Sequence, residues 1–364
     1  MKVSLITLHR VFNYGSVLQT YASQKVFEDA GYEVEVVDYI TEQRTNKRLF
    51  LGVPDTVKKD FVHKYAYLAL KSVSVLIKKN TFGGFIRKNI HLTKRKYITA
   101  QDIINDPPQA DIYVTGSDQV WNSQYNEGVD KGFFLEYAPS DKKKIAYVAS
   151  FGKTKLDNSE IEITKKYLQK YDAISVREDA AVKIVNELGY PACCIIDPTL
   201  QVRKEDWLKI ASERLVKEKY LILMLLYNED NGATEYARKI ADKKGLKLVK
   251  ISWDLKKTEL VDKLMTHRSP QDFLSLFYYA DFVLTNSFHG LAFSINLNKQ
   301  FVVVPRNEFN SRIESLLRLV GLEDRLIKED NLDVVDKKIQ YDNVNMILNA
   351  EREKAIKFIE SIRG

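Results

Sequence analysis

The sequence predicts an α/β fold, because segments typical of strands and of helices alternate along its 364 residues. The alternation stops once, at Asp197–Leu200, where a proline interrupts the regular pattern, and then begins again. Small polar residues follow strands in both halves, at the strand ends where open α/β sheets bind their ligands. We therefore expect two Rossmann-like domains that face a cleft.

The length suits this division into two domains. We expect an N-terminal domain over residues 1–197, with a basic helical insert at residues 44–96, and a C-terminal domain over residues 198–340. A final helix is expected at residues 341–364, and it could cross back to the N-terminal domain.

In the first half, apolar and alternating runs predict strands at residues 3–8, 32–37, 111–115, 144–150, 172–178 and 192–196. Helices are expected at residues 17–30, 61–77 and 180–188. Gly31 and Gly189 follow two of these helices, as is typical of C-terminal caps. The opening βαβ segment lacks G-x-G-x-x-G, so the dinucleotide-binding fingerprint is absent.

In the second half, strands are expected at residues 220–227, 246–251, 282–284 and 300–305. Helices are expected at residues 232–244, 261–265, 269–280, 291–297, 312–320 and 343–362. The helix at 269–280 has the clearest start, with Ser269 as cap, Pro270 at the first position and Asp272 at the third.

Composition limits the class of protein. The 56 Lys and Arg against 49 Asp and Glu give a net charge of +7, which suits anionic small molecules or an anionic membrane surface but is too small to indicate nucleic acid. Cys193 and Cys194 are adjacent, which fits disulfide geometry poorly, so we expect buried, reduced thiols. No signal peptide precedes the first strand and no apolar run approaches a membrane span, so we expect a cytoplasmic protein.

The basic insert at residues 44–96 has its own character. It holds 14 Lys or Arg and two acids, with aromatic residues between them. One interpretation is a solvated helical insert. The other is a surface that binds an anionic or lipid-linked ligand, peripherally at the inner face of a membrane.

The segment after the strand at residues 282–284 gives the strongest signal for a site. Asn286 and Ser287 end the strand with short polar side chains, and the helix that follows presents its first N–H groups at the strand end. His289 lies in the first helical turn, where the helix dipole favours the neutral ring. Gly290 leaves room for a ligand near the backbone. The alternative is a histidine of the core.

Polar residues also gather at two strand ends of the first half. These residues are Asn13, Gly15, Ser16, Ser117, Asp118 and Gln119. Trp121 follows the second group closely, so a tight turn with a packed tryptophan is an alternative to a site.

Two arginines are further candidates for binding an anion. Arg177 ends the strand at 172–178, and its guanidinium can bind a carboxylate or phosphate as a fork. It can equally pair with Glu178 or Asp179 on the surface. Arg306 follows the last strand, so the two arginines could reach a shared cleft.

The sequence resembles the polysaccharide pyruvyl transferase family over most of its length. The resemblance rests on five segments in this order: Asn13–Gln19, Gly116–Asn122, Ser175–Glu178, Asp197–Leu200 and Thr285–Gly290. It implies a fold like that of the two-domain GT-B glycosyltransferases. It also implies phosphoenolpyruvate as donor and a pair of sugar hydroxyls as acceptor, giving a pyruvate ketal and phosphate in surface or capsular polysaccharide biosynthesis.

The implied acceptor is a glycan or a lipid-linked or nucleotide-linked sugar. No cofactor besides the donor substrate is implied, and no Asp-x-Asp is present to suggest a divalent metal. One position departs from the family pattern: some members carry an arginine where this chain has Ser287. Anion binding then falls to other residues, or the donor differs.

The chemistry suggests roles for the candidate residues. A neutral His289 can serve as general acid or base. The N–H groups of Gly290 and Leu291 are candidates to hold an oxyanion. Arg177 would clamp the donor, and Asp118 would accept a proton from the acceptor hydroxyl.

Two other functions fit the same sequence. A GT-B glycosyltransferase that uses a nucleotide-sugar would share the fold, since fold does not fix function. A non-catalytic sugar-phosphate or nucleotide-binding protein is the second. Turnover of phosphoenolpyruvate, turnover of a nucleotide-sugar, or binding without phosphate release distinguishes the three.

Overall fold

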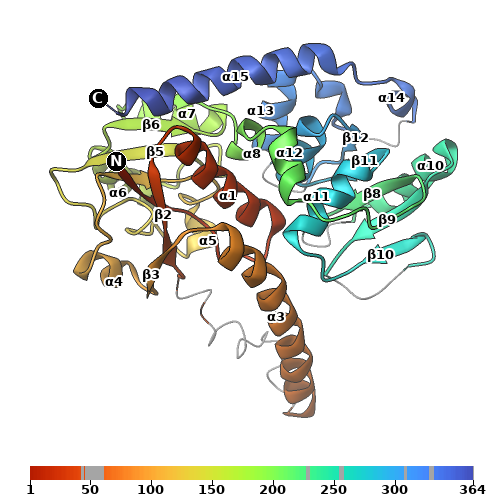
Figure 1. Ribbon diagram of the computed structural model, residues 1–364, viewed down its shortest axis with the longest axis horizontal. Coiled ribbons are helices and arrows are strands. Elements are labelled where there is room, and N and C mark those ends of the chain that lie inside the picture. The colour runs from red at the N-terminus through yellow and green to blue at the C-terminus, as the bar shows by residue number, and fades with distance from the viewer. Residues whose placement is uncertain are drawn as a thin grey trace. The chain divides into compact units, whose positions relative to one another are not determined.

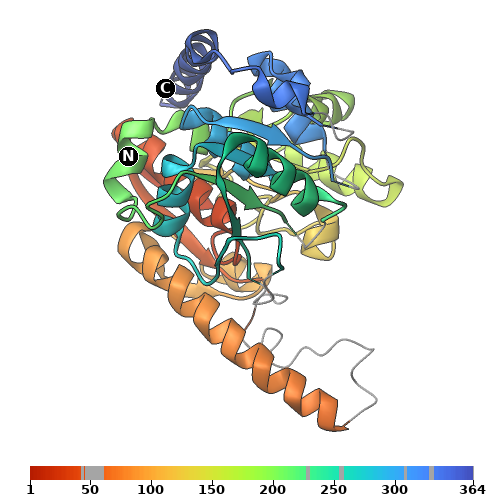
Figure 2. The ribbon, with the colours of Figure 1, turned by 90° about the vertical axis from the view of Figure 1, so that its right-hand side faces the viewer.

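Parallel β-sheets form the centre of both halves of the chain, as the computed structural model shows (Figures 1 and 2). The structure describes residues 1–364 except 42–44, 46–60, 227–229, 254–257, 307–309, 328–331 and 364. Within residues 61–70 it describes only the side chains of Tyr65 and Leu68. The start of the predicted basic insert and the end of the strand predicted at 220–227 therefore lie outside the described residues.

The first sheet has seven strands in the order β3-β2-β1-β4-β5-β6-β7, and β1 to β5 pair in parallel with their neighbours. The strands are β1 Lys2–Ile6, β2 Glu33–Tyr39, β3 Leu92–Tyr97, β4 Ile112–Thr115, β5 Lys143–Ala149, β6 Ala173–Val176 and β7 Cys193–Cys194. The helices of this part are α1 Tyr14–Asp29, α3 Phe61–Asn89, α4 Ala100–Asn105, α5 Ser123–Asn126, α6 Asn158–Leu168 and α7 Asp179–Glu187.

The second sheet has five parallel strands in the order β10-β9-β8-β11-β12. The strands are β8 Tyr220–Met224, β9 Lys247–Ile251, β10 Lys263–Met265, β11 Phe282–Thr285 and β12 Gln300–Val303. The helices are α8 Pro198–Gln201, α9 Lys204–Ile210, α10 Ala233–Lys244, α11 Pro270–Tyr279, α12 Phe288–Asn296, α13 Ser311–Val320, η2 Glu323–Arg325, α14 Asp333–Asp336 and α15 Tyr341–Ser361.

The predicted α/β class with parallel sheets is confirmed, and most of the expected elements are present. Two predictions were wrong. The basic helical insert was expected to reach residue 96, but Leu92–Tyr97 is strand β3, which pairs with β2. Residues 261–265 were expected in a short helix, but Lys263–Met265 is the edge strand β10, which pairs with Val249–Ile251 of β9. Val261 and Met265 are both buried, and their spacing of four residues imitates a helical face.

Helix starts follow the local sequence rules. The Ser269 and Asp272 side chains form the predicted capping box at α11, with Pro270 in the first turn. Asn13 caps α1 by accepting a hydrogen bond from the backbone N–H of Gly15. The long helix α3 extends to Asn89, well past the predicted end, and its first turns project from the rest of the first half (Figures 1 and 2).

The chain divides into two compact units. The first comprises Met1–Phe151, Leu156–Ser175 and Asn186–Ala192, and the second comprises Gly152–Lys155, Val176–Val185 and Cys193–Gly364. The second unit thus includes Val176–Val185, which the sequence analysis assigned to the N-terminal domain. Within the second unit, α15 packs on α8 and α13. Its predicted return to the N-terminal domain stays a prediction.

Gly290 shows how tightly β11 and α12 are packed. A Cβ added at Gly290 would lie 2.4 Å from Thr285 Oγ1, on the strand that precedes the helix. We had expected this glycine to admit a ligand, but the space beside it is filled by Thr285. Its lack of a side chain is therefore explained by the close approach of strand and helix.

We predict that Gly290→Ala destabilises the protein by about 1–3 kcal/mol, because Thr285 must move to admit the methyl group. Gly84→Ala on α3 is the matched control, since an added Cβ there has no neighbour within 4 Å. The control should be neutral or stabilising by up to about 1 kcal/mol, through its better helix propensity. Urea denaturation followed by circular dichroism measures both, and equal midpoints would contradict the packing argument.

Candidate active site

Within the first unit, the predicted polar residues gather at the switch point of the sheet. Strands β1 and β4 are neighbours, and the strand order reverses between them, which is where ligands of open α/β sheets bind. Ser16 Oγ, at the start of α1, donates to Asp118 Oδ2 over 2.6 Å, and Asp118 follows β4. The loop after β1 and the loop after β4 therefore meet at this carboxylate.

Local backbone geometry fixes Asp118. Its φ of 78° lies in the left-handed region, which is uncommon for a residue other than glycine. Its Oδ1 accepts a hydrogen bond from the N–H of Gln119. The neighbouring Ser117 accepts a hydrogen bond through its carbonyl from Thr7 Oγ1. The predicted cluster is thus an ordered, hydrogen-bonded turn.

Trp121 has a packing role beside this turn. Its ring stacks on Phe134 at 5.2 Å between centroids, and its Nε1 donates to the carbonyl of Phe133. The alternative of a packed tryptophan is therefore correct for Trp121. The polar turn and the packed ring coexist in one loop.

Within the second unit, the segment after β11 also lies at a switch point, because β8 and β11 are neighbours at the reversal of strand order. The backbone N–H of Leu226, just after β8, donates to Asn286 Oδ1 over 2.7 Å. The Ser287 side chain caps α12 and accepts from the N–H of Gly290. His289 follows in the first turn, as predicted, with 6% of its surface exposed.

The oxyanion hole predicted at the N–H groups of Gly290 and Leu291 is not formed. The N–H of Gly290 is bonded to Ser287 Oγ, and the N–H of Leu291 is bonded to the Ser287 carbonyl. Both groups serve the helix itself, so neither is placed to hold an oxyanion. The Ser287 hydroxyl, a predicted donor-binding group, caps α12 in this structure.

A buried carboxylate joins the other candidates of the second unit. Asp197 Oδ2 lies 3.0 Å from Arg177 Nη1 and 3.9 Å from His289 Nε2. Asp197 Oδ1 accepts hydrogen bonds from the backbone N–H and the hydroxyl of Thr199, at 2.9 and 2.7 Å. Arg177 therefore pairs with Asp197 and not with Asp179, which was one of the predicted surface partners. Glu178, the other predicted partner, has its Oε2 3.8 Å from Arg177 Nε.

The charges of this group support one another. Burial alone would raise the pKa of Asp197, but His289, Arg177 and the hydrogen bonds from Thr199 outweigh it and lower the pKa below its ordinary value. Asp197 is 1% exposed and stays ionised at neutral pH. The carboxylate thus places negative charge next to both the guanidinium and the imidazole.

A second buried arginine, which the sequence analysis missed, lies close by. The guanidinium carbon of Arg177 lies 4.7 Å from the centre of the Phe288 ring, and that of Arg312 lies 5.6 Å from the same ring. Arg312 is in the first turn of α13 and is 7% exposed. Its only sequence signal is an arginine on the apolar side of an amphipathic helix. Two guanidinium groups therefore meet at the residue before His289.

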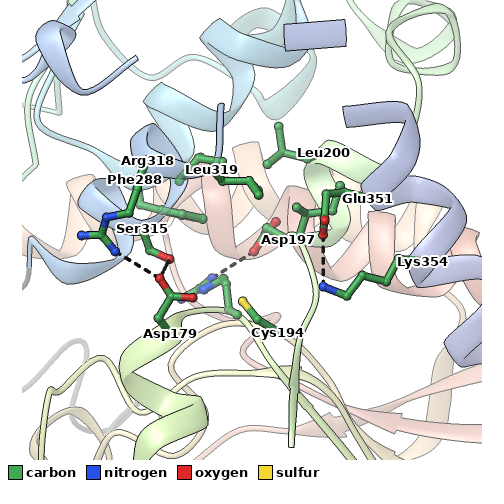
Figure 3. A pocket seen from close by; sticks show the side chains of 13 residues that line it. Asp179, Cys194, Asp197, Leu200, Phe288, Ser315, Arg318, Leu319, Glu351 and Lys354 are labelled. Carbon is green, nitrogen blue, oxygen red and sulfur yellow. Dashed lines mark hydrogen bonds and ion pairs between the residues drawn. The ribbon is translucent and has the colours of Figure 1, made fainter. Parts of the chain in front are cut away.

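A cavity of about 220 Å³ opens on the Arg177 and Asp197 side of this group (Figure 3). Figure 3 shows Asp179 bound to Ser315 and Arg318 at one wall, and Glu351 paired with Lys354 at the opposite wall. Neither His289 nor Arg306 is among its lining residues. The hypothesis that Arg306 and Arg177 share a cleft stays untested.

Cys194 lines the same cavity and departs from the expectation of a buried thiol. Both Cys193 and Cys194 are half-buried free thiols. Burial raises the pKa of Cys194 to about 12, so the thiol is neutral at physiological pH.

The two sheets, with polar loops at the switch point of each, define an α/β protein of the GT-B type. The sequence profile of the polysaccharide pyruvyl transferase family matches residues 13–308. The chain therefore belongs to the polysaccharide pyruvyl transferase family, which is a family of transferases. This confirms the resemblance inferred from the five sequence segments.

Two solved structures of one enzyme support the fold over the whole chain. UDP-GlcNAc 2-epimerase of Methanocaldococcus jannaschii, in complex with UDP-GlcNAc and UDP, is 13% identical with a TM-score of 0.54, covering 100% of this chain and 99% of its own. A second structure of that enzyme is 12% identical with a TM-score of 0.51 and the same coverage. A spinosyn rhamnosyltransferase complexed with thymidine diphosphate is 10% identical, with a TM-score of 0.41 and coverage of 99% and 96%. Curated protein sequences give no match.

We predict that Asp197→Ala destabilises the protein by about 3–5 kcal/mol at neutral pH, because it leaves a buried guanidinium without its carboxylate. Asp336→Ala is the control, since that carboxylate pairs with Lys243 at the surface, and it should change stability little. Urea denaturation compares the three proteins.

The same pair predicts a dependence on pH. The folded-state pKa of Asp197 is depressed, so its stabilisation is present above the unfolded pKa of about 4 and is lost as the pH falls through the folded value. The stability difference between the parent and Asp197→Ala should therefore shrink in acid. A difference that is constant from neutral pH into acid would contradict the charge argument.

Proposed function

We propose that this protein transfers the pyruvyl group of phosphoenolpyruvate to two hydroxyls of a sugar, as a ketal, in the biosynthesis of a surface polysaccharide. The family match supports pyruvyl transfer to a polysaccharide. The observation that carries the choice of donor is the set of two buried guanidinium groups, Arg177 and Arg312, at the ring of Phe288, the residue before His289. A donor with both a phosphate and a carboxylate needs more than one cation.

The reaction makes three demands on the protein. One proton must reach the methylene carbon of the donor, the two acceptor hydroxyls must each lose a proton, and phosphate must leave with the second proton. His289 is the candidate for the first transfer, because an imidazole can give and take protons near neutral pH. The guanidinium groups would hold the donor anions and the phosphate that forms.

Arg312 offers a replacement for the arginine that some family members carry where this chain has Ser287. Serine brings no charge to this position, and its hydroxyl is used as the cap of α12. Arg312 contacts the Phe288 ring from α13, and Arg177 contacts the same ring, so Arg312 is a second cation at Phe288. In our proposal, the anion-binding role therefore falls to a residue on a different helix.

Asp118 remains the candidate base for an acceptor hydroxyl. Its carboxylate is held by Ser16 and by the N–H of Gln119, in the loop that follows β4 of the first unit. A held, buried carboxylate has a defined direction for accepting a proton. We propose this base role for Asp118 within the first unit, to which it belongs.

The cations of α3 support an anionic acceptor, such as a lipid-linked sugar at a membrane surface. Phe82 packs on Phe12 and Tyr14, which places the preceding turn of α3 near the loop after β1. Burial lowers the pKa of Lys79, and the charges of Arg10 and Lys96 lower it further, so these three cations lie near one another. In the part of the chain that the structure describes, no helix is long and apolar enough to cross a bilayer.

We predict that His289→Gln lowers turnover by about 10²-fold or more, because general acid or base catalysis contributes about that much. Phosphate release from phosphoenolpyruvate with candidate glycans measures turnover, and thermal melting checks the fold. His267→Gln, in a different loop of the second unit, is the control. Turnover of His289→Gln near that of the parent would rule out the assigned role.

We predict that Arg177→Ala weakens phosphoenolpyruvate binding about 10- to 150-fold, since a charge-assisted contact contributes about 1.5–3 kcal/mol. Arg312→Ala should have an effect in the same range. Arg177→Lys should recover only part of the loss, because lysine restores the charge without the fork. Calorimetric titration measures each affinity.

Arg238→Ala is the matched control for these arginines, because Arg238 lies in the same unit on α10, pairs with Asp242 and Asp262, and does not line the cavity beside Arg177. Its donor affinity should stay near that of the parent. If all four variants bind as the parent does, the arginines are structural. If the parent does not bind phosphoenolpyruvate, titration with a UDP-sugar tests the nucleotide-sugar alternative.

We predict that replacing Lys78, Lys79, Arg87 and Lys88 by Gln weakens sedimentation with anionic lipid vesicles. Such binding should also fade with salt, since it is electrostatic. The control replaces four exposed lysines of the second unit, Lys217, Lys219, Lys239 and Lys263, by Gln. Equal loss in both variants, or no vesicle binding by the parent at low salt, would favour the solvated-helix interpretation.

A further inference from the structure

The two oxygens of Asp197 have different environments. Oδ1 is fixed by the backbone N–H and hydroxyl of Thr199, in the turn that Pro198 begins. Oδ2 faces two groups at once, Arg177 Nη1 at 3.0 Å and His289 Nε2 at 3.9 Å. The carboxylate is therefore held in one orientation and shared between a candidate anion-binding residue and a candidate proton carrier.

We propose that Asp197 is a positioning residue that couples binding of the anionic donor at Arg177 to uptake of a proton by His289. This inference rests on the proposed function, since it needs phosphoenolpyruvate to bind at Arg177. It goes beyond that function because it assigns the Asp197–Leu200 motif, which has no role in the reaction so far. It also predicts when in the cycle the histidine becomes charged.

The coupling follows from the sharing of one charge. Without donor, the negative charge of Asp197 is shared between the guanidinium of Arg177 and the imidazole of His289. A donor phosphate or carboxylate that binds Arg177 competes with Asp197 for its N–H groups. The charge of Asp197 is then less offset, and a protonated His289 is favoured.

The proton has a defined path in this scheme. His289 takes it from solvent as the donor binds. It then passes the proton to the methylene carbon of the donor, where the π electrons of the enol double bond form the new C–H bond and the N–H electron pair stays on the imidazole. The acceptor oxygen bonds to the adjacent carbon, and the proton of that hydroxyl returns to the protein or to solvent.

Other charged groups near this cluster act on the same equilibrium. Glu178 Oε2 lies 3.8 Å from Arg177 Nε, and Arg312 lies against the same Phe288 ring as Arg177. The cavity beside Asp197 adds Asp179 with Arg318, Glu351 with Lys354, and the neutral thiol of Cys194. Each of these acids lies near a cation, so the change in net charge on donor binding comes from the donor itself and from the proton that His289 takes up.

The first test is calorimetric titration of phosphoenolpyruvate into the full chain, at a pH slightly above neutral, in two buffers that differ in protonation enthalpy. The difference between the two observed enthalpies gives the number of protons taken up. We expect an uptake of up to about one proton per donor in the parent. Asp197→Asn should still bind donor but take up fewer protons. Thr199→Val is the matched control, because it perturbs Oδ1 and keeps the charge, and its uptake should equal that of the parent.

The second test is the pH profile of kcat. In Asp197→Asn the alkaline limb should move to lower pH by roughly one to two units, since an opposite charge close to a histidine stabilises its protonated form. Thr199→Val should keep the limb of the parent. A uniform loss of kcat in Asp197→Asn with an unmoved limb would mean that Asp197 is merely structural.

The outcomes separate this inference from the proposed function. Absence of donor binding in either buffer would overturn the proposed function. Donor binding by the parent with no proton uptake would overturn the coupling while leaving the function in place. Equal uptake in the parent and Asp197→Asn would do the same. If Asp197→Asn does not fold, an absence of proton uptake by the parent still overturns the coupling.

Discussion

The carboxylate of Asp197 is buried within 3.0 Å of one guanidinium and 3.9 Å of the imidazole of His289. Each of these groups would be costly to bury alone, and each is made tolerable by the others. Three separate segments of the second unit supply them: the end of β6, the turn before α8 and the start of α12. Because removal of Asp197 leaves both of its partners without their carboxylate, the interaction fixes these segments to one another as well as placing the reactive groups.

All three groups follow the ends of strands. Arg177 follows β6 and Asp197 follows β7 of the first sheet, and His289 follows β11 of the second, at the reversal of strand order between β8 and β11. After β11, the Asn286 side chain accepts a hydrogen bond from Leu226, and Thr285 packs directly on Gly290. Asn286 and Ser287 therefore stabilise the turn after β11, and His289 is the residue of this segment that lies next to a charged group, Asp197.

The sequence allowed prediction of the features that depend on local pattern. The strands, the cap of α11 and the position of His289 in a first helical turn follow from periodicity and capping chemistry, and all are present. Features that depend on tertiary contact were missed or misread. β10 is a strand because it pairs with β9, and Gly290 is needed because Thr285 packs against it. Arg312 reaches Phe288 from a helix that begins 22 residues after His289. No periodicity or capping rule encodes these contacts, because each joins residues of different helices and strands.

The most direct measurement is a crystal structure of the protein with phosphoenolpyruvate bound. The account predicts that the phosphate and carboxylate of the donor contact Arg177 and Arg312, that the methylene carbon faces His289, and that Arg177 lies farther from Asp197 than the 3.0 Å seen here. A donor bound away from Phe288 and His289, with the pair of Arg177 and Asp197 unchanged, would contradict it.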